Sequence, residues 1–291
     1  MLKTSDLTHK EDLLNYWRAW LSVPILLLPA FTGLPGGVLT ILYGLLIWFL
    51  LNDMNFLLHQ HVHRPLTHSN TKNTILDWWM SLVTAMCAYN WRQQHVLRHH
   101  YNNNSWGEPT PWEFEKDTLV RGSVYAVKKG ASMFWFPFRE AIVFGLQGKK
   151  TDKLDYRKAA VQHSVIVLLA VGLMFIEPYF YIPYYFFVYF FTTLTDYDNH
   201  VGCDESRYGF SNNCLNPHYN VVRNNFGYHT AHHYNPSAHW TELPKLHAAM
   251  ADKIPQERIT HKIWTGFWTP PVVIYYAGHV WKTLLRPSPQ T

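Results

Sequence analysis

Histidine is the residue type in this sequence whose number and spacing most directly indicate chemistry. The chain has 18 histidines, and four short stretches of the sequence supply nine candidate ligands. These nine are His59 and His63 in HQHVH, His95, His99 and His100 in HVLRHH, His200 in TDYDNH, and His229, His232 and His233 in YHTAHH. A neutral imidazole binds Zn, Cu, Fe and Ni. The pattern therefore predicts a metal centre built from imidazoles.

The spacing within the stretches indicates that several rings can point to one place. Residues three or four apart share a face of an α-helix. This relation joins His59 with His63, His95 with His99, and His229 with both His232 and His233, while His100 lies one step round from His99. Nine candidate ligands exceed the four of a structural zinc site and suit two metals with positions left open for O₂. His61 is predicted to point away, and isolated histidines such as His163 are expected to be ordinary polar residues.

Four apolar stretches predict the helices that position these histidines. They run from about Trp20 to Leu34, Val38 to Leu58, Val161 to Ile176 and Tyr179 to Thr195. A hydrocarbon core about 30 Å thick needs ~20 apolar residues per helix, so the second stretch qualifies and the first is short. Breaks at Pro35-Gly36-Gly37 and Glu177-Pro178 predict two hairpins. We therefore expect an all-α integral membrane protein with about four transmembrane helices.

Two hairpins return the chain to the side from which it started, so the four histidine stretches are expected at one membrane surface. Lys and Arg are dense between Arg121 and Lys158, which favours the cytoplasmic side for that surface. We expect a cytosolic, histidine-rich helical cap there. The apolar segments Ile75–Tyr89, Ala131–Leu146 and Trp264–Leu285 are interpreted as interfacial helices.

Composition sets further bounds on the class of protein. The chain has 291 residues, a net charge of +5 and only 15% charged residues, below the roughly 25% of soluble domains. Its three cysteines, Cys87, Cys203 and Cys214, form no CxxC pair and are expected to be reduced thiols in a cytosol-facing protein. No nucleic-acid-reading motif accompanies the basic stretch, so nucleic acid is not an expected partner.

At these residues the chain resembles the membrane fatty acid desaturase superfamily. The family pattern of HxxxH, HxxxHH and HxxHH boxes is matched by His59–His63, His95–His100 and His229–His233. The family often supplies one more histidine after the fourth spanning helix, and Asp198-Asn199-His200 matches in position. The resemblance covers roughly residues 38–250 of a single expected domain, 1–291. It implies that the nine histidines hold two iron ions.

Two departures from the family pattern leave alternatives open. His63-Arg64-x-x-Thr67-His68 also matches the first box of acyl-CoA desaturases, so His68 is a reserve ligand beside His59. The run from Asn225 to His233, followed by His239-Trp240, resembles bacterial members that include undecene-forming fatty acid decarboxylases. The branch of the family stays open on these residues.

The resemblance implies a non-haem di-iron oxidoreductase that uses O₂ to oxidise a fatty acyl chain, with desaturation as the first interpretation. Decarboxylation of a free fatty acid to a terminal alkene and hydroxylation of an alkane or lipid are the alternatives within the family. The expected substrate is a fatty acid or acyl thioester in the lipid bilayer. Electrons are expected from a separate ferredoxin- or cytochrome-type donor. The expected location is a bacterial inner membrane, with the active site facing the cytoplasm.

Four polar residues beside the boxes are candidates to orient the ligand imidazoles: Asp196, Asp198, Asn199 and Asn225. Helix-capping and turn roles are equally open for them. A membrane metal-binding protein without redox chemistry is the non-enzyme alternative. A metal carrier should place its ligands inside the spanning helices, whereas these histidines follow the helix ends. A zinc hydrolase would need a general base such as the Glu of HExxH, and that motif is absent from the sequence.

Overall fold

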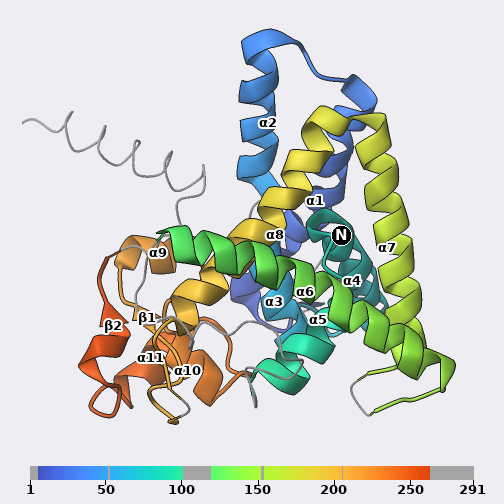
Figure 1. Cartoon of the computed structure of the whole chain (residues 1–291). Coiled ribbons are helices and arrows are strands. Elements are labelled where there is room, and N and C mark those ends of the chain that lie inside the picture. The colour runs from blue at the N-terminus through green and yellow to red at the C-terminus, as the bar shows by residue number, and fades with distance from the viewer. Residues whose placement is uncertain (1–5, 52, 101–118, 152–153, 205, 263–291) are drawn as a thin grey trace, which may run out of the picture.

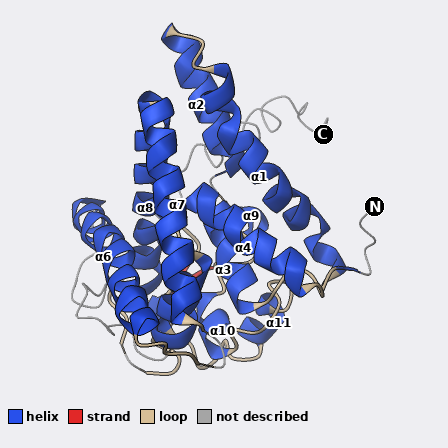
Figure 2. Cartoon of the chain, turned by 90° about the vertical axis from the view of Figure 1, so that its right-hand side faces the viewer, coloured by secondary structure: helices blue, strands red, loops and turns tan. Residues whose placement is uncertain are grey.

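The computed structural model of the chain describes residues 6–51, 53–100, 119–151, 154–204 and 206–262. Helices make up almost all of its regular structure (Figure 1, Figure 2), which agrees with the predicted all-α class. The expected interfacial segment Trp264–Leu285 lies outside the described residues. The long helices are α1 (Leu13–Thr32), α2 (Gly37–Leu51), α4 (Asn70–Thr84), α6 (Leu119–Leu146), α7 (Tyr156–Ile176) and α8 (Pro178–His200).

Two helical hairpins stand at the predicted breaks. The turn between α1 and α2 contains Gly33, Gly36 and Gly37, all with positive φ, a conformation open to glycine at little cost. The turn between α7 and α8 is Glu177, after which Pro178 occupies the first turn of α8, where its missing N–H is tolerated. Both turns lie at the same end of the molecule, at the top of Figure 1.

Two of the four expected spans are long and apolar enough to cross a membrane, among the residues that the structure describes. They are Gly37–His63, with a mean hydropathy of 1.7, and Tyr156–Ile176, with 2.2. Helices α1 and α8 have 20 and 23 residues and so the necessary length. Both helices are more polar than the apolar stretches in the sequence suggest. Helix α8 contains Tyr, Thr and Asp residues, and α1 contains Asn15 and Arg18.

The aromatic side chains of α8 have a role that the sequence analysis did not predict. Tyr184 and Tyr185 are both buried. Tyr184, Tyr185 and Tyr189 donate hydrogen bonds to the carbonyls of Val83, Leu82 and Ala85, at distances of 2.9, 3.0 and 2.6 Å. Leu82 and Val83 belong to the last turn of α4 and Ala85 is its C-cap residue, so these carbonyls lack partners within the helix. The hydrogen bonds from these tyrosines therefore hold α8 against the C-terminal end of α4.

Helix α6 is one continuous helix that crosses α8 and packs against both α8 and α7 (Figure 1). The expected interfacial segment Ala131–Leu146 is its second half. The close approach to α8 depends on Gly122, where an added Cβ would lie 3.0 Å from the Leu194 side chain and 3.2 Å from the Tyr197 ring. The expected segment Ile75–Tyr89 divides into α4 and the start of α5 (Ala88–Trp91), because Ala85 adopts a left-handed conformation.

The remaining elements form a cap at the end opposite the hairpin turns. They are α3 (Met54–His63), the π-helical η3 (Arg92–His99), α9 (Pro217–Val222), α10 (His229–Tyr234), α11 (Leu243–Ala248), the 3₁₀ turns η2 (Lys10–Asp12) and η5 (Gln256–Arg258), and the parallel strands β1 (Asn213–Cys214) and β2 (Ile259–Thr260). The N-terminal segment is tied to this cap, since Thr8 N–H donates to the Leu66 carbonyl and Asp12 contacts His239.

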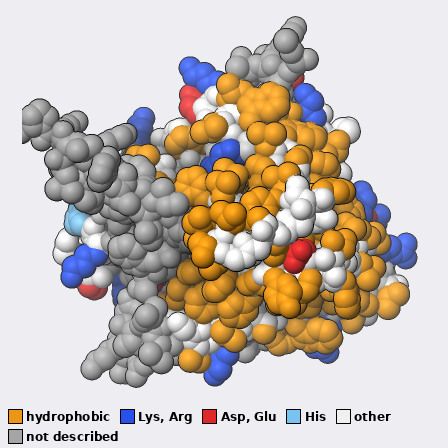
Figure 3. All heavy atoms as spheres, turned by 90° about the horizontal axis from the view of Figure 1, so that it is seen from above, with side chains coloured by type: hydrophobic (Ala, Val, Ile, Leu, Met, Phe, Trp, Pro, Cys, Tyr) orange, Lys and Arg blue, Asp and Glu red, His pale blue; other side chains and the backbone are white. Residues whose placement is uncertain are grey.

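Apolar side chains remain exposed on the long helices away from the cap. Phe31, Val38, Leu168 and Phe175 are among them, and Figure 3 shows hydrophobic side chains over much of the end that carries the hairpin turns. A monomeric soluble protein rarely exposes apolar area on this scale. A lipid environment would cover these side chains.

Candidate metal centre

The nine predicted histidines lie in two neighbouring groups. The first group, cluster 1, contains His59, His63, His95, His100 and His232, and the second, cluster 2, contains His99, His200, His229 and His233. Within each cluster one nitrogen from every ring lies within 4.8 Å of the others. Each cluster could therefore hold one metal ion.

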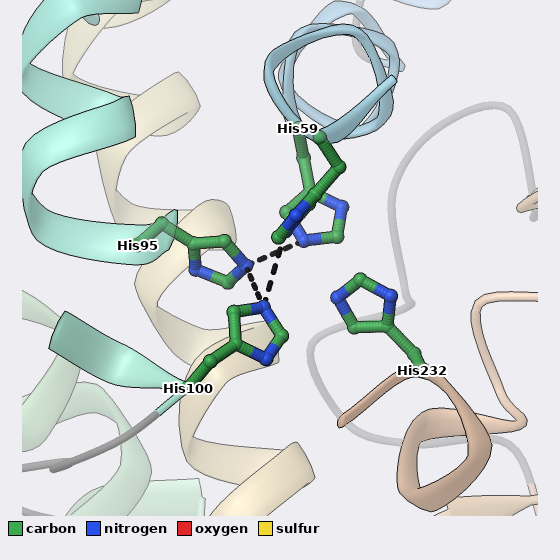
Figure 4. Close-up of side chains that lie close together, drawn as sticks. His59, His95, His100 and His232 are labelled. Carbon is green, nitrogen blue, oxygen red and sulfur yellow. Dashed lines mark hydrogen bonds between the residues drawn. The ribbon is translucent and has the colours of Figure 1, made fainter. Parts of the chain in front are cut away.

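Cluster 1 brings together rings from α3, η3 and α10. The Nε2 atom of His95 lies 2.7 Å from that of His59 and 3.2 Å from that of His100, and the His100 and His63 Nε2 atoms are 3.1 Å apart. The His232 ring approaches the other three labelled rings in Figure 4. Two nitrogens bound at ~2.1 Å to one ion lie about 3.0–3.4 Å apart in octahedral or tetrahedral geometry. The observed spacings are close to those of such a coordination shell.

Cluster 2 draws its rings from η3, α8 and α10. The Nε2 atom of His229 lies 3.3 Å from that of His200 and 3.1 Å from that of His233. The other ring nitrogen of His200, Nδ1, lies 3.0 Å from the Phe210 carbonyl. A donated Nδ1–H bond to a carbonyl is the usual contact that orients a ligand imidazole and leaves Nε2 for a metal.

The π-helix η3 divides its histidines between the two clusters. On an α-helix His95 and His99 would share a face, as the sequence analysis expected. In η3 the hydrogen bonds connect residues five apart, and the His100 N–H donates to the His95 carbonyl at 3.4 Å. His95 and His100 therefore share a face and enter cluster 1, whereas His99 turns to cluster 2. Short π-helical turns are frequent at functional sites.

The spacing in the other two histidine stretches agrees with α-helical geometry. His59 and His63, four apart on α3, both enter cluster 1. His229 and His233, four apart on α10, enter cluster 2, and His232 lies on the neighbouring face and enters cluster 1. Helix α10 thus contributes to both clusters, as η3 does.

Burial keeps these imidazoles neutral. Removal from water, together with repulsion from His200, lowers the pKa of His99 and of His232 to about 3. A neutral ring offers a lone pair to a metal, whereas a protonated ring does not. At neutral pH both side chains are therefore in the form that a ligand requires.

The donor set and its unpartnered nitrogens fit metal ions. His232 Nε2 is buried without a hydrogen-bond partner among the described residues, and the Nε2 atoms of cluster 1 converge on each other. A neutral imidazole has only one N–H donor, so these rings cannot provide a hydrogen bond for every one of the converging nitrogen atoms. All nine members are imidazoles, which suits Fe, Zn, Cu or Ni. The nine ligands together exceed the four that one tetrahedral zinc site requires.

A small cavity lies between the two clusters. Its volume is about 40 Å³, and its walls include His59 and His95 from cluster 1 and His99 and His229 from cluster 2. Phe56, Trp91 and Phe226 make the apolar part of the lining. A cavity of ~10–15 Å³ holds one water-sized molecule, so this cavity has room for O₂ beside both clusters.

Asp196 is one of two predicted orienting residues that lie in this cavity wall. Burial opposes ionisation of Asp196, but the nearby charge of Lys129, with smaller effects from His99, His200 and the Tyr125 hydroxyl, holds the pKa of the carboxyl below its ordinary value. The Tyr125 hydroxyl donates to Asp196 at 2.5 Å. Tyr125 and Lys129 belong to α6, far from the histidine boxes in sequence. No sequence motif indicates that they lie near the metal centre.

The other three candidate orienting residues have other contacts. Asn199 lines the same cavity, and the backbone carbonyls of Asp198 and Asn199 accept hydrogen bonds from Asn212. Asn225 has a φ of 58° and donates from Nδ2 to the Trp240 carbonyl at 3.1 Å. Asn225 is thus a turn residue that directs the chain into α10.

Two histidines beside the boxes lie outside both clusters. The reserve ligand His68 is exposed and does not belong to either cluster, whereas His59 belongs to cluster 1. His61 points away from the clusters, as predicted, and its Nε2 lies 3.4 Å from Asp77, which pairs with Arg92 at the start of η3. This buried network ties α3, α4 and η3 together.

Helices that bring nine buried or half-buried imidazoles into two adjacent clusters define a histidine-rich, two-site metal-binding class of helical protein. The family comparison makes this more specific, because residues 32–265 match the Fatty acid desaturase family. The chain therefore belongs to the fatty acid desaturase family, whose members are generally oxidoreductases. No curated protein and no solved structure gives a significant match to the chain.

Proposed function

We propose that this chain is a membrane oxidoreductase that binds two iron ions and uses O₂ to desaturate a fatty acyl chain. The observation that carries the proposal is the convergence of nine imidazoles, six of them buried and three half-buried, in clusters of five and four, in a chain that belongs to the fatty acid desaturase family. When bound, a pair of irons supplies the redox chemistry for activating O₂. Cluster 1 and cluster 2 would each hold one ion.

The protein residues around the clusters hold, orient and shield the reacting groups. Asp196, fixed by Tyr125 and near Lys129, would act on His99 and His200 through its negative charge. Phe56, Trp91 and Phe226 would exclude water from the cavity between the clusters. Desaturation of one CH₂–CH₂ unit by O₂ takes up two electrons and two protons and releases two waters. A separate electron donor is therefore part of the proposal.

We further propose that α1, α2, α7 and α8 cross the membrane as two hairpins, with the metal centre on the cytoplasmic side. The two hairpin turns lie at one end of the molecule, and the histidine clusters lie at the other. The basic residues of α6 and of the following loop, including Lys149 and Lys150, belong to the histidine end. A positive cytoplasmic face is the common arrangement in membrane proteins.

The test is anaerobic reconstitution of the purified protein with iron and a chemical or ferredoxin reductant, followed by O₂. We expect two irons per chain and an unsaturated product by mass spectrometry. His63→Ala should lose metal and product, whereas His261→Ala, which alters an exposed histidine, should retain both. Free fatty acids and acyl thioesters are supplied separately. Native zinc in the clusters with no O₂-dependent product from either substrate would refute the proposal.

A further inference from the structure

His163 of α7 is a buried histidine that belongs to neither metal cluster. An isolated histidine of this kind is expected to be an ordinary polar residue with satisfied hydrogen bonds. It is 3% exposed, its ring stacks on Phe138 with centroids 4.4 Å apart, and its Nδ1 atom contacts the Asn90 side-chain amide. Its Nε2 atom has no hydrogen-bond partner among the described residues. A buried polar atom without a partner is costly, which indicates that something else binds there.

Asn90 presents a second unpartnered atom beside the first. Asn90 is 5% exposed, and its Oδ1 atom lacks a partner within the described part of the chain. If the Asn90 amide donates to His163 Nδ1, the ring proton is on Nε2 and Oδ1 remains as an acceptor. If the amide is flipped, its Oδ1 accepts from the Nδ1–H group of His163. The His163 Nε2 atom is then the unpartnered acceptor, and the Asn90 N–H₂ group is the unpartnered donor. In either orientation of the amide, Asn90 and His163 together present one donor and one acceptor without a partner.

These atoms belong to a small polar cavity close to cluster 1. Asn90, His163 and Gln94 line a cavity of about 20 Å³, and the buried Oε1 atom of Gln94 is also unpartnered among the described residues. Trp91 lines both this cavity and the cavity between the clusters, and its ring stacks on that of the ligand His95 at 5.3 Å. No Lys, Arg, Asp or Glu is among the described residues of the lining. The ligand is therefore a neutral group with a donor and an acceptor.

An apolar groove shares Tyr189 with the polar cavity as a lining residue. The groove lies between α6, α7 and α8, has a volume of about 540 Å³ and is lined almost wholly by hydrophobic side chains. Val127, Val171 and Phe186 are lining residues that are 39–53% exposed. Because α7 has the length and hydropathy of a membrane span, the groove would open to lipid.

We propose that the chain binds a long-chain free fatty acid, with its protonated carboxyl group between Asn90 and His163 and its tail in the groove between α6, α7 and α8. This inference rests on the proposed function for the reaction that follows binding. A protonated carboxyl has one O–H donor and one C=O acceptor, which match the unpartnered donor and acceptor that Asn90 and His163 present. A thioester offers acceptors only, and its carrier is too large for a 20 Å³ cavity.

The orientation has a consequence for the position of attack. The carboxyl site adjoins Trp91, which separates it from the cavity between the clusters. Carbons near the carboxyl end would therefore lie closest to the metals, and carbons near the methyl end would lie in the groove. The position of oxidation should be counted from the carboxyl end and should not change with chain length.

Photolabelling of the metal-free protein in lipid nanodiscs tests the orientation without any reaction. One fatty acid probe carries a diazirine next to the carboxyl group, and the other carries it at the methyl end. We expect the first to label peptides that contain Asn90–Gln94 or His163, and the second to label the groove around Val127, Val171 and Phe186. Unlabelled free fatty acid should compete with both probes, and its methyl ester should compete less well.

Paired variants test the two halves of the site. His163→Leu should weaken binding of the free acid roughly tenfold and leave the methyl ester unchanged, whereas His163→Gln keeps a donor and an acceptor and should restore binding. Ala131→Trp should block the groove and abolish methyl-end labelling. Val124→Trp alters an exposed residue of the same helix outside the groove lining and is the matched control.

Three outcomes would overturn the inference. Equal labelling of all lipid-exposed helices, without competition by free acid, would mean that the groove holds only bilayer lipid. Unchanged acid binding in His163→Leu would mean that the polar cavity holds only water. Labelling of the Asn90 region by the methyl-end probe would mean that the chain binds in the reverse direction. If binding behaves as expected but no O₂-dependent product forms, the proposed reaction fails and the binding site stands.

Discussion

Asp12 shows how one buried side chain can hold the N-terminal segment on the cap. Its carboxylate accepts hydrogen bonds from His239 at 3.0 Å, from Trp240 at 2.9 Å and from Asn15 at 3.1 Å. Burial alone would raise the pKa of Asp12, but these donors outweigh it, so the pKa lies below its ordinary value. His9 stacks on the His239 ring at 3.9 Å and adds a second contact. The same residues adjoin cluster 1 through a small cavity lined by Asp12, His63 and His239.

We expect this contact to stabilise the fold in a pH-dependent way. Because the folded-state pKa of Asp12 is depressed, its stabilisation is fully present above the unfolded-state value of about 4 and is lost as pH falls through the folded-state value. Asp12→Asn should remove roughly 1–3 kcal/mol and flatten this acid dependence. Thermal unfolding between neutral and acid pH measures both effects.

The neighbouring Glu11 supplies the control for Asp12. Glu11 is exposed, so Glu11→Gln should leave the melting curve at each pH unchanged. Limited proteolysis of the N-terminal segment gives an independent readout, since Asp12→Asn should accelerate cleavage there. Equal acid sensitivity of wild type and Asp12→Asn would show that another group controls the transition.

At the residue scale, the spacing of the histidines in the sequence identified the nine that cluster, but it did not show which histidine belongs to which cluster. The i, i+4 relation placed His59 with His63 and His229 with His233, because α3 and α10 are α-helical. It misplaced His99, because no sequence rule signals that η3 has π-helical hydrogen bonds. Tyr125 and Lys129 escaped detection because they approach Asp196 only through the packing of α6 on α8.

At the element scale, the packing of α6 on α8 controls whether Tyr125 reaches Asp196. Gly122 lies at the closest approach, three residues before Tyr125. Gly122→Leu should force α6 away from Leu194 and Tyr197, with an overpacking penalty of ~1–3 kcal/mol. We expect a lower melting temperature in detergent and weaker metal retention by cluster 2.

Another helical glycine offers a matched comparison for Gly122. A Cβ added at Gly172 of α7 would meet nothing within 4 Å among the described residues. Gly172→Leu should therefore keep or raise the melting temperature, because leucine favours the helix more than glycine does. If the two variants melted alike, close packing at Gly122 would not be what holds α6 in place.

The helices themselves were largely predictable, and their boundaries were less so. The hairpin breaks at Pro35-Gly36-Gly37 and Glu177-Pro178 stand where the sequence placed them. The tyrosine contacts from α8 to the end of α4 were not foreseeable, because they depend on which carbonyls a distant helix leaves unpaired. Periodicity marks a buried face of a helix but does not identify the partner of that face.

At the scale of the whole molecule, the proposed topology predicts which surfaces face each side of the membrane. Val38 and Tyr179, 71% and 85% exposed, lie near the two hairpin turns, and Lys245 is exposed in the cap. In intact cells a membrane-impermeant maleimide should label Val38→Cys and Tyr179→Cys. It should label Lys245→Cys only after the cells are opened.

The native thiols should not obscure this measurement. Cys87, Cys203 and Cys214 are all buried, and burial raises the pKa of Cys87 and of Cys203 to about 12, so little reactive thiolate forms. The unaltered protein is the blank. Labelling of Lys245→Cys in intact cells would place the histidine end outside and contradict the proposed orientation.

The sharing of η3 and α10 between the two clusters has a consequence for how the holoenzyme would assemble. His99 and His100 are adjacent in the chain but serve different clusters, and so do His232 and His233. An ion that orders one cluster would fix both peptide segments and so prepare the other for its own ion. Loading should then be cooperative, and half-filled molecules should be scarce at intermediate iron supply.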